Sequence, residues 1–513
     1  MALSRAAGAC RLALRTQWAV VRQLGSAASD PPGDDRKRGR LVDLGALRRE
    51  RSLRPPTERR QPAPPRPAHS SRPTAEQLQL NADIQACASA EAVLGLVLSR
   101  LAVLNEVNAA TALITISRRV RKGETASWLS GDARFAQLLS AAESLFAQMA
   151  PQELSNALYA CGQLDVTPPA RWLQRYWQTS ALKLGEFVPQ NFSNTLYACG
   201  QLDITPTVEW LQHYWHVSAP KLGEFNPQNF SNTLYACGQL GITPPANWLQ
   251  RFWHVSASKL GQFNSQDFSN TLYACGQLGI APPADWLQRY WHAGASKLGE
   301  FNPQNFSNTV YACGQLDVSP PADWLQRFWH FSAPKLGEFI PQNFSNTLYA
   351  CGQLGITPPV NWLQRFWHVS ASKLGQFNSQ DFSNTLYACG QLGITLPTDW
   401  MQRFWHASAS KLGEFKPQEL SNTLYTCGQL GITPPANWLQ RFWHVSASKL
   451  GEFKPQHFSN TLYACGQLGI VPPADWLQRY WHASALKLGE FIPQHFSNTL
   501  YACGQLGITP PAD

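Results

Sequence analysis

The stretch from Thr243 to Ile280, TPPANWLQRFWHVSASKLGQFNSQDFSNTLYACGQLGI, is one copy of a 38-residue unit that recurs through most of this 513-residue chain. Eighteen of the 20 Trp and ten of the 12 Cys follow that spacing. The first Trp of the unit recurs at 172, 210, 248, 286, 324, 362, 400, 438 and 476. A fixed period of this length indicates one small structural unit copied many times, rather than several distinct globular domains.

The first half of the unit predicts an amphipathic helix. Thr243 is expected to cap the helix and Pro244 to take its first position, where a missing N–H costs nothing. We expect the helix to run to Leu260 and to stop at Gly261. Its apolar residues share one side at helical spacing, and they are Trp248, Leu249, Phe252, Trp253, Ser256 and Leu260.

The second half predicts another helix, capped by Asn264. Phe263 and Phe268 have the spacing of a hydrophobic staple around that cap. Gly279 is expected to supply a left-handed cap at the other end, with Ile280 as the apolar contact beyond it. Phe268, Leu272 and Cys275 share one face of the helix, and the opposite face carries Gln266, Ser269, Asn270, Tyr273 and Gln277.

Short links between the helices predict antiparallel neighbours, and one pair cannot cover its own Trp-rich stripe. We therefore expect an all-α fold, an α-solenoid or superhelix of antiparallel helix pairs, acting as a monomer. The array covers 151–513, with nine full units at 167–508 and partial units at both ends. Residues 76–150 are predicted to form degenerate helical repeats. The last unit has barely begun at Asp513, so we expect either further sequence or a frayed end.

Charge is concentrated at the N-terminus. Residues 1–72 hold 16 Lys and Arg against 6 Asp and Glu, whereas 151–513 hold 20 of each, so the net charge of +9 says nothing about what the repeats bind. Residues 1–28 contain four Arg and no acid, which is typical of an organelle targeting presequence. Few Ser favour the mitochondrion over the chloroplast, and a basic disordered tail is the alternative. Residues 29–75, basic and rich in Pro and Arg, are expected to be a disordered linker.

Several classes of function lack support in the sequence. No apolar run is long enough to cross a membrane. The periodic Cys lie on the apolar face of the second helix, which indicates small core residues rather than disulfides or metal ligands. No phosphate loop or nucleophile motif appears. We therefore expect no catalytic residues, no metal, no cofactor and no small-molecule substrate, and we expect the protein not to be an enzyme.

The motifs Pro-Pro-x-x-Trp-Leu and Phe-x-Pro-Gln-x-Phe-Ser-Asn-x-Leu-Tyr-Ala, repeated every 38 residues, resemble the octotricopeptide repeat family. The resemblance covers about two-thirds of the chain. It implies an organelle-targeted, sequence-selective RNA-binding protein that acts in RNA processing, stability or translation. Thr207 and Leu396 each replace one of the paired prolines, His213 replaces the usual Arg, and no C-terminal RAP-type domain is found.

Helical-repeat RNA readers use two or three side chains per unit on one base. The polar face of the second helix offers amides and a ring that can stack on a base, while ladders between neighbouring repeats are the competing use of these amides. The candidate RNA-binding residues are Gln228, Ser231, Asn232, Tyr235, Gln266, Ser269, Asn270, Tyr273, Gln304, Ser307, Asn308, Tyr311, Gln342, Ser345, Asn346 and Tyr349. Arg251 and Lys259 are candidates for phosphate contacts, although an i,i+4 pair with Asp is the expected use of the equivalent Arg289 and Arg327.

Most second-helix residues do not vary between units, so selectivity must come from the positions that do. These open the two helices and differ in donor and acceptor pattern. The candidates are Asn247, Asp285, Asp323, Asn361, Asp267, Asn305, Asn343 and Asp381. Acids in a first turn also suit a helix N-terminus for purely structural reasons. A scaffold that binds an extended peptide or protein partner is the alternative to binding single-stranded RNA.

Overall fold

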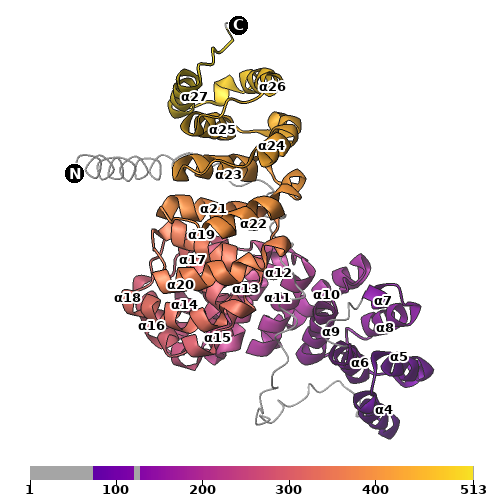
Figure 1. Cartoon of the computed structure of the whole chain (residues 1–513). Helices are drawn as coiled ribbons and strands as arrows, with labels where there is room; N and C mark the ends of the chain where they lie inside the picture. The colour runs from indigo at the N-terminus through magenta and orange to yellow at the C-terminus, as the bar shows by residue number, and fades with distance from the viewer. Residues whose placement is uncertain (1–72, 121–126, 512–513) are drawn as a thin grey trace. The chain divides into compact units, whose positions relative to one another are not determined.

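The computed structural model describes residues 73–120 and 127–511, shown in colour in Figure 1. These residues form 24 α-helices joined by short turns and 3-10 helices, and the described part of the chain contains no strand. The predicted presequence (1–28) and nearly all of the predicted linker (29–75) lie outside the described residues. None of the described helices is long and apolar enough to span a membrane.

Each 38-residue unit forms the two helices that its sequence predicts. The first helices are α10 (Ala170–Lys183), α12 (Val208–Ser218), α14 (Ala246–Ala257), α16 (Ala284–Ala295), α18 (Ala322–Ser332), α20 (Val360–Ala371), α22 (Thr398–Ala409), α24 (Ala436–Lys449) and α26 (Ala474–Ala485). The second helices are α11 (Pro189–Leu202), α13 (Pro227–Leu240), α15 (Ser265–Leu278), α17 (Pro303–Leu316), α19 (Pro341–Leu354), α21 (Ser379–Leu392), α23 (Pro417–Leu430), α25 (Pro455–Leu468) and α27 (Pro493–Leu506). The predicted all-α solenoid is confirmed.

A 3-10 helix joins the two helices of each unit. These helices are η2 (Leu184–Glu186), η3 (Ala219–Glu224), η4 (Leu260–Gln262), η5 (Leu298–Glu300), η6 (Ala333–Glu338), η7 (Leu374–Gln376), η8 (Leu412–Glu414), η9 (Leu450–Glu452) and η10 (Leu488–Glu490).

The predicted ends of the first helix are wrong. Helix α14 begins at Ala246, and its cap residue is Pro245, with no side-chain cap. A residue that precedes a proline is kept out of the helical region, so Pro244 cannot begin the helix ahead of Pro245. At the other end, Gly261 lies within η4 and has no positive φ. The chain leaves α14 through this 3-10 turn instead of a left-handed glycine cap.

The predicted ends of the second helix are confirmed. Asn264 accepts a hydrogen bond from the Asp267 amide, and the Asp267 side chain accepts one from the Asn264 amide, which completes a capping box. The Phe263 and Phe268 rings lie 5.4 Å apart as the staple requires. Gly279 takes φ +64°, and the next amide donates back to the Cys275 carbonyl.

Seven helical segments precede the regular units: α4 (Ala75–Ala86), α5 (Ala90–Ser99), η1 (Leu101–Val103), α6 (Glu106–Arg119), α7 (Ser127–Ser130), α8 (Ala133–Ser144) and α9 (Pro151–Leu164). Helices α4, α6 and α9 pack in succession and lead into α11, so they continue the row of second helices. Helices α5 and α8 likewise lead into α10. Asn105 and Asn108 exchange amide hydrogen bonds as Asn264 and Asp267 do, which shows the same cap in a degenerate sequence.

Tryptophan pairs join consecutive first helices. The Trp253 and Trp286 rings meet edge to face with centroids 5.1 Å apart, and the Trp286 Nε1–H donates to Ser256 Oγ at 2.9 Å. Equivalent ring pairs join every consecutive pair of units from α10 to α26. Aromatic pairs of this geometry stabilise by about 0.5–1.5 kcal/mol beyond their buried area.

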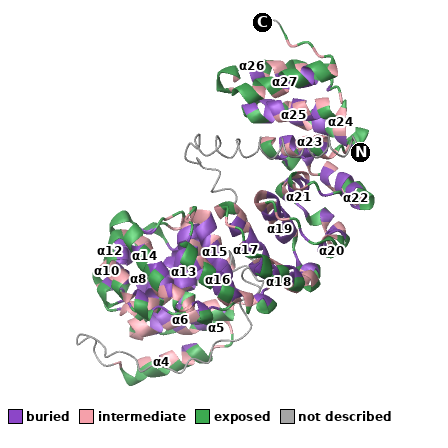
Figure 2. Cartoon of the chain, turned by 90° about the vertical axis from the view of Figure 1, so that its left-hand side faces the viewer, coloured by how far each residue is buried: buried purple, intermediate pink, exposed green. Residues whose placement is uncertain are grey.

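Consecutive second helices lie closer together than consecutive first helices. A Cβ atom placed on Gly276 would lie only 3.1 Å from the Ala312 Cα, so a glycine faces an alanine where α15 meets α17. Buried residues run along these helices, as Figure 2 shows for α13 and α15. The array is therefore tightly packed on its second-helix layer and more open on its first-helix layer.

One hydrogen bond of the tryptophan series is missing. Gly294 occupies the position of Ser256, and the buried Nε1–H of Trp324 has no partner in the described structure. An added side chain at Gly294 would meet only Phe268 at an ordinary 3.5 Å. Gly294→Ser should therefore restore the bond and stabilise the array by about 1–2 kcal/mol.

Hydrogen exchange of the α16 and α18 amides measures this effect locally. Ser370→Gly, which removes the acceptor of the Trp400 Nε1–H, is the matched control and should speed exchange in α20 and α22. Unchanged exchange in Gly294→Ser would contradict the account.

Candidate functional site

A stripe of polar side chains runs along each second helix. In α15 it consists of Gln266, Asn270, Tyr273 and Gln277, whose spacing of 4, 3 and 4 keeps them on one side of the helix. We call these four positions, in every unit, the amide–tyrosine strip. In α17 and α19 the equivalent Gln, Asn and Tyr are all partly exposed. In α13, Gln228 is exposed, whereas Asn232 and Tyr235 are buried.

The tyrosines of the strip form a column of ring contacts. The ring centroids of Tyr273 and Tyr311 are 6.4 Å apart, and those of Tyr311 and Tyr349 are 6.5 Å apart. Contacts of 6.0–6.4 Å continue the column from Tyr159 to Tyr387 and from Tyr425 to Tyr501. Partial burial raises the pKa of Tyr311 to about 12. The phenol therefore stays protonated and can donate a hydrogen bond at neutral pH.

The structure places the candidate serines away from this strip. Ser231, Ser269, Ser307 and Ser345 are buried between neighbouring second helices. The hydroxyl of Ser345 donates to the Asp381 carboxylate of the next unit at 2.6 Å, and that of Ser307 accepts from the Asn343 amide at 2.9 Å. Ser231, Ser307 and Ser345 thus join neighbouring repeats, whereas the buried Ser269 hydroxyl has no hydrogen-bond partner in the described structure. We do not assign these serines to a ligand-binding surface.

The varying positions that open the second helix have the same structural use. Asp267, Asn305, Asn343 and Asp381 are all buried, and each side chain accepts a hydrogen bond from the amide of its cap residue. The hydrogen-bonding groups that distinguish Asp from Asn at these positions bond to the helix caps and, in most units, to the serine of the preceding unit. The other varying positions, Asn247, Asp285, Asp323 and Asn361, are exposed at the start of the first helices, away from the amide–tyrosine strip.

Lysine has a structural role that the sequence did not reveal. Lys259 Nζ donates to the carbonyls of Gly223 and Phe225 in the preceding unit, at 2.7 and 2.6 Å. The same pair of bonds recurs in eight of the nine units, from Lys183 to Lys487, whereas Lys297 donates to Glu300 instead. Burial lowers the pKa of Lys259. This clamp, rather than a phosphate contact, is the use the structure gives that lysine.

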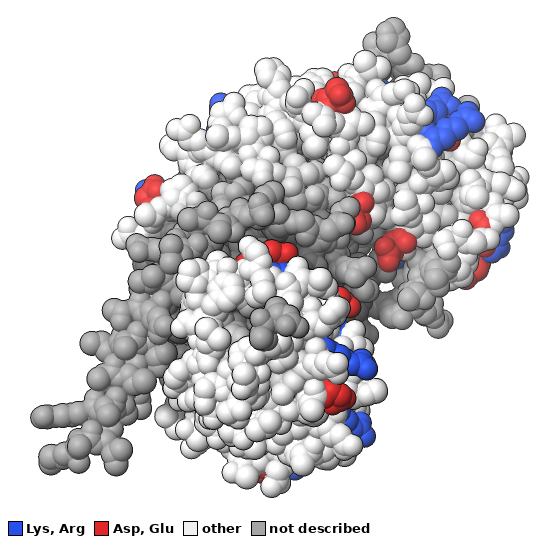
Figure 3. All heavy atoms as spheres, turned by 90° about the horizontal axis from the view of Figure 1, so that it is seen from above, with Lys and Arg blue, Asp and Glu red and all other residues white. Residues whose placement is uncertain are grey.

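The arginines lie on the first helices. Arg251, Arg289 and Arg327 are exposed, and the expected ion pairs with Asp285 and Asp323 do not form in the described structure. The amide–tyrosine strip itself carries no charged residue in any of the nine units. On the face shown in Figure 3, charged side chains form separate spots among mostly uncharged residues. Recognition on the strip would therefore rest on stacking and amide hydrogen bonds.

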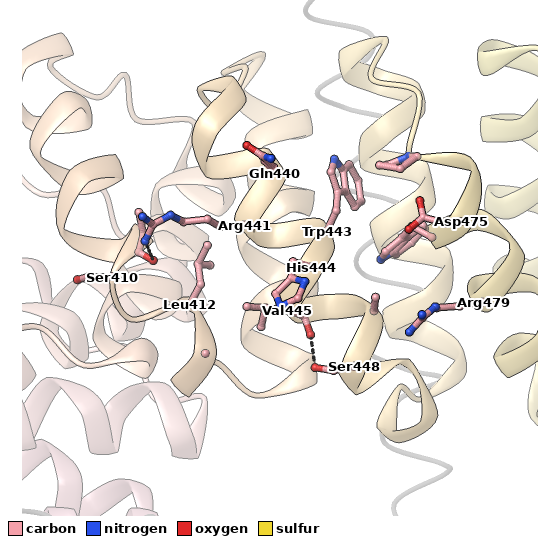
Figure 4. A pocket seen from close by; sticks show the side chains of 15 residues that line it. Ser410, Leu412, Gln440, Arg441, Trp443, His444, Val445, Ser448, Asp475 and Arg479 are labelled. Carbon is pink, nitrogen blue, oxygen red and sulfur yellow. Dashed lines mark hydrogen bonds between the residues drawn. The ribbon is translucent and has the colours of Figure 1, made fainter.

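A groove of about 790 Å³ opens between the first helices α24 and α26 (Figure 4). Arg441 and His444 reach it from α24, and Asp475 and Arg479 reach it from α26. Arg441 donates to the Ala409 carbonyl at 3.5 Å. The groove reflects the wider spacing of the first helices and does not include the amide–tyrosine strip.

The periodic cysteines are buried, as predicted, and none forms a disulfide in the described residues. Burial raises the pKa of Cys161 to about 12, so the thiol stays protonated. No cluster of His, Cys, Asp or Glu in the described residues could hold a metal ion.

Asp267 should weaken the array at neutral pH. Burial raises its pKa, with the Ser231 hydrogen bond acting in the opposite direction. The native state therefore binds more protons than the unfolded chain between the ordinary and the raised pKa, so stability falls as pH rises through that window. Asn occupies the equivalent position in α13 and α17, where no charge is buried. We expect Asp267→Asn to stabilise the array by about 1 kcal/mol at pH 7 and to lose this advantage toward pH 4.

The stability gain is measured as the difference in thermal unfolding midpoint between Asp267→Asn and the parent protein, from pH 4 to pH 8. Asp285→Asn, which removes an exposed carboxylate outside the buried row, is the control. A flat difference between pH 4 and 8 for Asp267→Asn would show that its carboxylate is not destabilised by burial.

Comparison with known proteins places the chain in a family. The family described as Tbc2 translation factor, C-terminal domain, matches residues 73–298 and 226–340. The one described as Tbc2 translation factor, N-terminal domain, matches 325–446. Along this chain the match to the C-terminal domain thus precedes the match to the N-terminal domain.

No curated protein matches the chain. Among solved structures, a chain from a homology model of the full-length AP-3 complex in an intermediate open conformation aligns with 84% of this chain and 82% of its own length. That alignment has 10% identity and a TM-score of 0.33. The matches to the C-terminal domain together span more than half of the sequence, and the chain therefore belongs to the Tbc2 translation factor family.

Proposed function

We propose that the array binds single-stranded RNA along the amide–tyrosine strip and acts in the processing, stability or translation of organellar RNA. The observation that carries the proposal is the column of partly exposed tyrosine rings flanked by amides. The family name, which describes a translation factor, supports an RNA-related role. The 38-residue motifs further support our assignment of the units to the octotricopeptide repeat type.

The chemistry of the strip suits an extended polynucleotide. A base can stack on a tyrosine ring regardless of its identity, and such stacking contributes about 1–3 kcal/mol per base. Asn and Gln both donate and accept, so they can pair with the edges of an unstacked base. At one nucleotide per unit, the nine units would hold on the order of ten nucleotides.

The strip is nearly the same in every unit, so it cannot by itself distinguish one base from another along the target. The units at 243–280 and 357–394 are almost identical in sequence. A row of equal binding positions suits a target of low sequence complexity. We therefore propose a repetitive or compositionally biased stretch of RNA as the ligand.

The role of the tyrosines can be tested with Tyr311→Leu/Tyr349→Leu. Loss of two stacking rings should weaken binding of a single-stranded RNA pool by at least about tenfold in a filter assay. Tyr311→Phe/Tyr349→Phe keeps both rings and should stay near the parent affinity. Arg327→Gln/Arg365→Gln, on the first helices, should also have little effect.

The salt dependence of binding gives a second readout. Because the strip is uncharged, affinity should fall only gently as salt increases, since few phosphates are neutralised. A steep salt dependence together with loss of binding in the arginine variant would assign the RNA to the first-helix layer instead. Failure of the parent protein to retain any single-stranded RNA at low salt would reject the proposal.

A peptide-binding scaffold is the second candidate, and the neutrality of the strip favours it. Amide side chains can pair with the backbone of an extended peptide as they can with bases. Retention of a protein partner that is lost in the leucine variant, without retention of RNA, would support this function.

We further propose that the protein works inside an organelle, the mitochondrion first and the chloroplast as the alternative. The four arginines and the absence of acids in residues 1–28 support import. Residues 1–28 fused to a fluorescent reporter should direct it to mitochondria. Replacing Arg5, Arg11, Arg15 and Arg22 with Gln should leave the reporter in the cytosol. Diffuse fluorescence from the unaltered fusion would contradict the proposal.

A further inference from the structure

One step of the second-helix row differs from all the others. Helices α21 and α23 pack less closely than any other consecutive pair of second helices in the nine units. The tyrosine column is interrupted at the same step, because Tyr387 and Tyr425 form no ring contact in the described structure. We call this step, between α21 and α23, the seam.

A larger side chain explains the wider spacing. Where α19 meets α21, a Cβ on Gly352 would lie 3.1 Å from the Ala388 Cα, so the two backbones nearly touch. At the seam Thr426 replaces that alanine, and its Cγ2 lies 2.7 Å from the corresponding point on Gly390. The threonine methyl group occupies the space that the neighbouring backbone fills elsewhere, so α23 stands off from α21.

The side-chain hydrogen bond found at most earlier steps is missing at the seam. At five of the six steps from α9 to α21 a buried Asn or Asp side chain pairs with the serine of the preceding unit, as Asn343 does with Ser307. At the seam the position holds Glu419, whose carboxylate accepts from its own cap amide at Lys416. Ser383 is left with a contact of 3.4 Å to the Glu419 carbonyl, as Ser421 is with the His457 carbonyl at the next, closely packed step. Two acids, Asp381 and Glu419, thus follow one another in the buried row, and their repulsion opposes closure.

We propose that Tyr387 and Tyr425 form a slot that takes one nucleobase of the bound RNA between their rings. The proposal rests on the function proposed above. A base stacked on two rings needs them about 7 Å apart, which is two contact distances of about 3.5 Å. The closed steps, at 6.0–6.5 Å, leave no room for a base between two rings, so a base at these steps can lie only against the exposed part of one ring.

Both helices of the seam carry amides on the same strip as the two tyrosines. Gln391 and Gln429 are exposed, and Asn384 and Asn422 are partly exposed, one pair from each helix. They can donate to and accept from the edges of an inserted base. Both tyrosines are partly exposed as well.

The slot would solve a problem that near-identical units create. An array of equal positions can hold a repetitive RNA in many registers. A single step that accepts an inserted base fixes one nucleotide relative to the six units before the seam and the three after it. The seam thus gives an otherwise uniform row a defined register.

Thr426→Ala/Glu419→Asn tests the slot, because it restores the residues found at the closed steps. The probe is a 12-nucleotide single-stranded RNA with one central 2-aminopurine, whose fluorescence is quenched by stacking. We expect strong quenching with the parent protein, loss of most of it in the double variant, and an affinity about tenfold lower. The variant should also unfold at a higher temperature than the parent, which shows that it is folded.

Single substitutions supply the matched comparison. Tyr425→Leu, at the seam, should abolish the quenching of 2-aminopurine. Tyr349→Leu, at a closed step, should lower the affinity only modestly and leave the quenching unchanged. Equal effects of these two variants, or unchanged quenching in Thr426→Ala/Glu419→Asn, would overturn the slot while leaving RNA binding intact. If the parent protein binds no RNA, the proposed function itself fails.

Discussion

Consecutive second helices approach so closely where Gly276 faces Ala312 that the glycine has no room for a side chain. This contact, repeated along the row, sets the spacing on which the tyrosine column depends. The first helices are held by tryptophan pairs, whose bulk keeps them farther apart. Close packing on one layer and wide packing on the other follow from the sizes of the side chains that meet. Where Thr426 replaces the alanine, the two helices pack less closely and the tyrosine column is interrupted.

Most polar groups of the unit are used to hold the array together. Serine and Asn or Asp side chains join neighbouring second helices. Lysine donates to carbonyls of the preceding unit, and the first Trp of most units donates its Nε1–H to a serine of the preceding first helix. A buried donor without a partner costs about 1–3 kcal/mol, so these bonds are strongly constrained. The Gln, Asn and Tyr of the amide–tyrosine strip are the groups that we propose for the ligand. In that proposal, stability and binding depend on different faces of the same helix.

The sequence predicted what depends on local chemistry. Gly279 ends its helix because only a residue tolerant of positive φ can do so, and Phe263 and Phe268 are neighbours in sequence. The start of the first helix was misplaced because the second proline of each pair keeps the proline before it out of the helical region. The roles of Ser231, Asp267 and Lys259 were missed because they depend on contacts with residues 34–36 positions away. An invariant lysine every 38 residues was the one available signal for the clamp.

Ultraviolet crosslinking of the full chain to single-stranded RNA, followed by mass spectrometry of the attached peptides, tests the central claim most directly. The account predicts crosslinks at Tyr311, Tyr349 and their equivalents on the second helices. Crosslinks confined to first-helix residues around Arg251 and Arg441, or none at all, would contradict it.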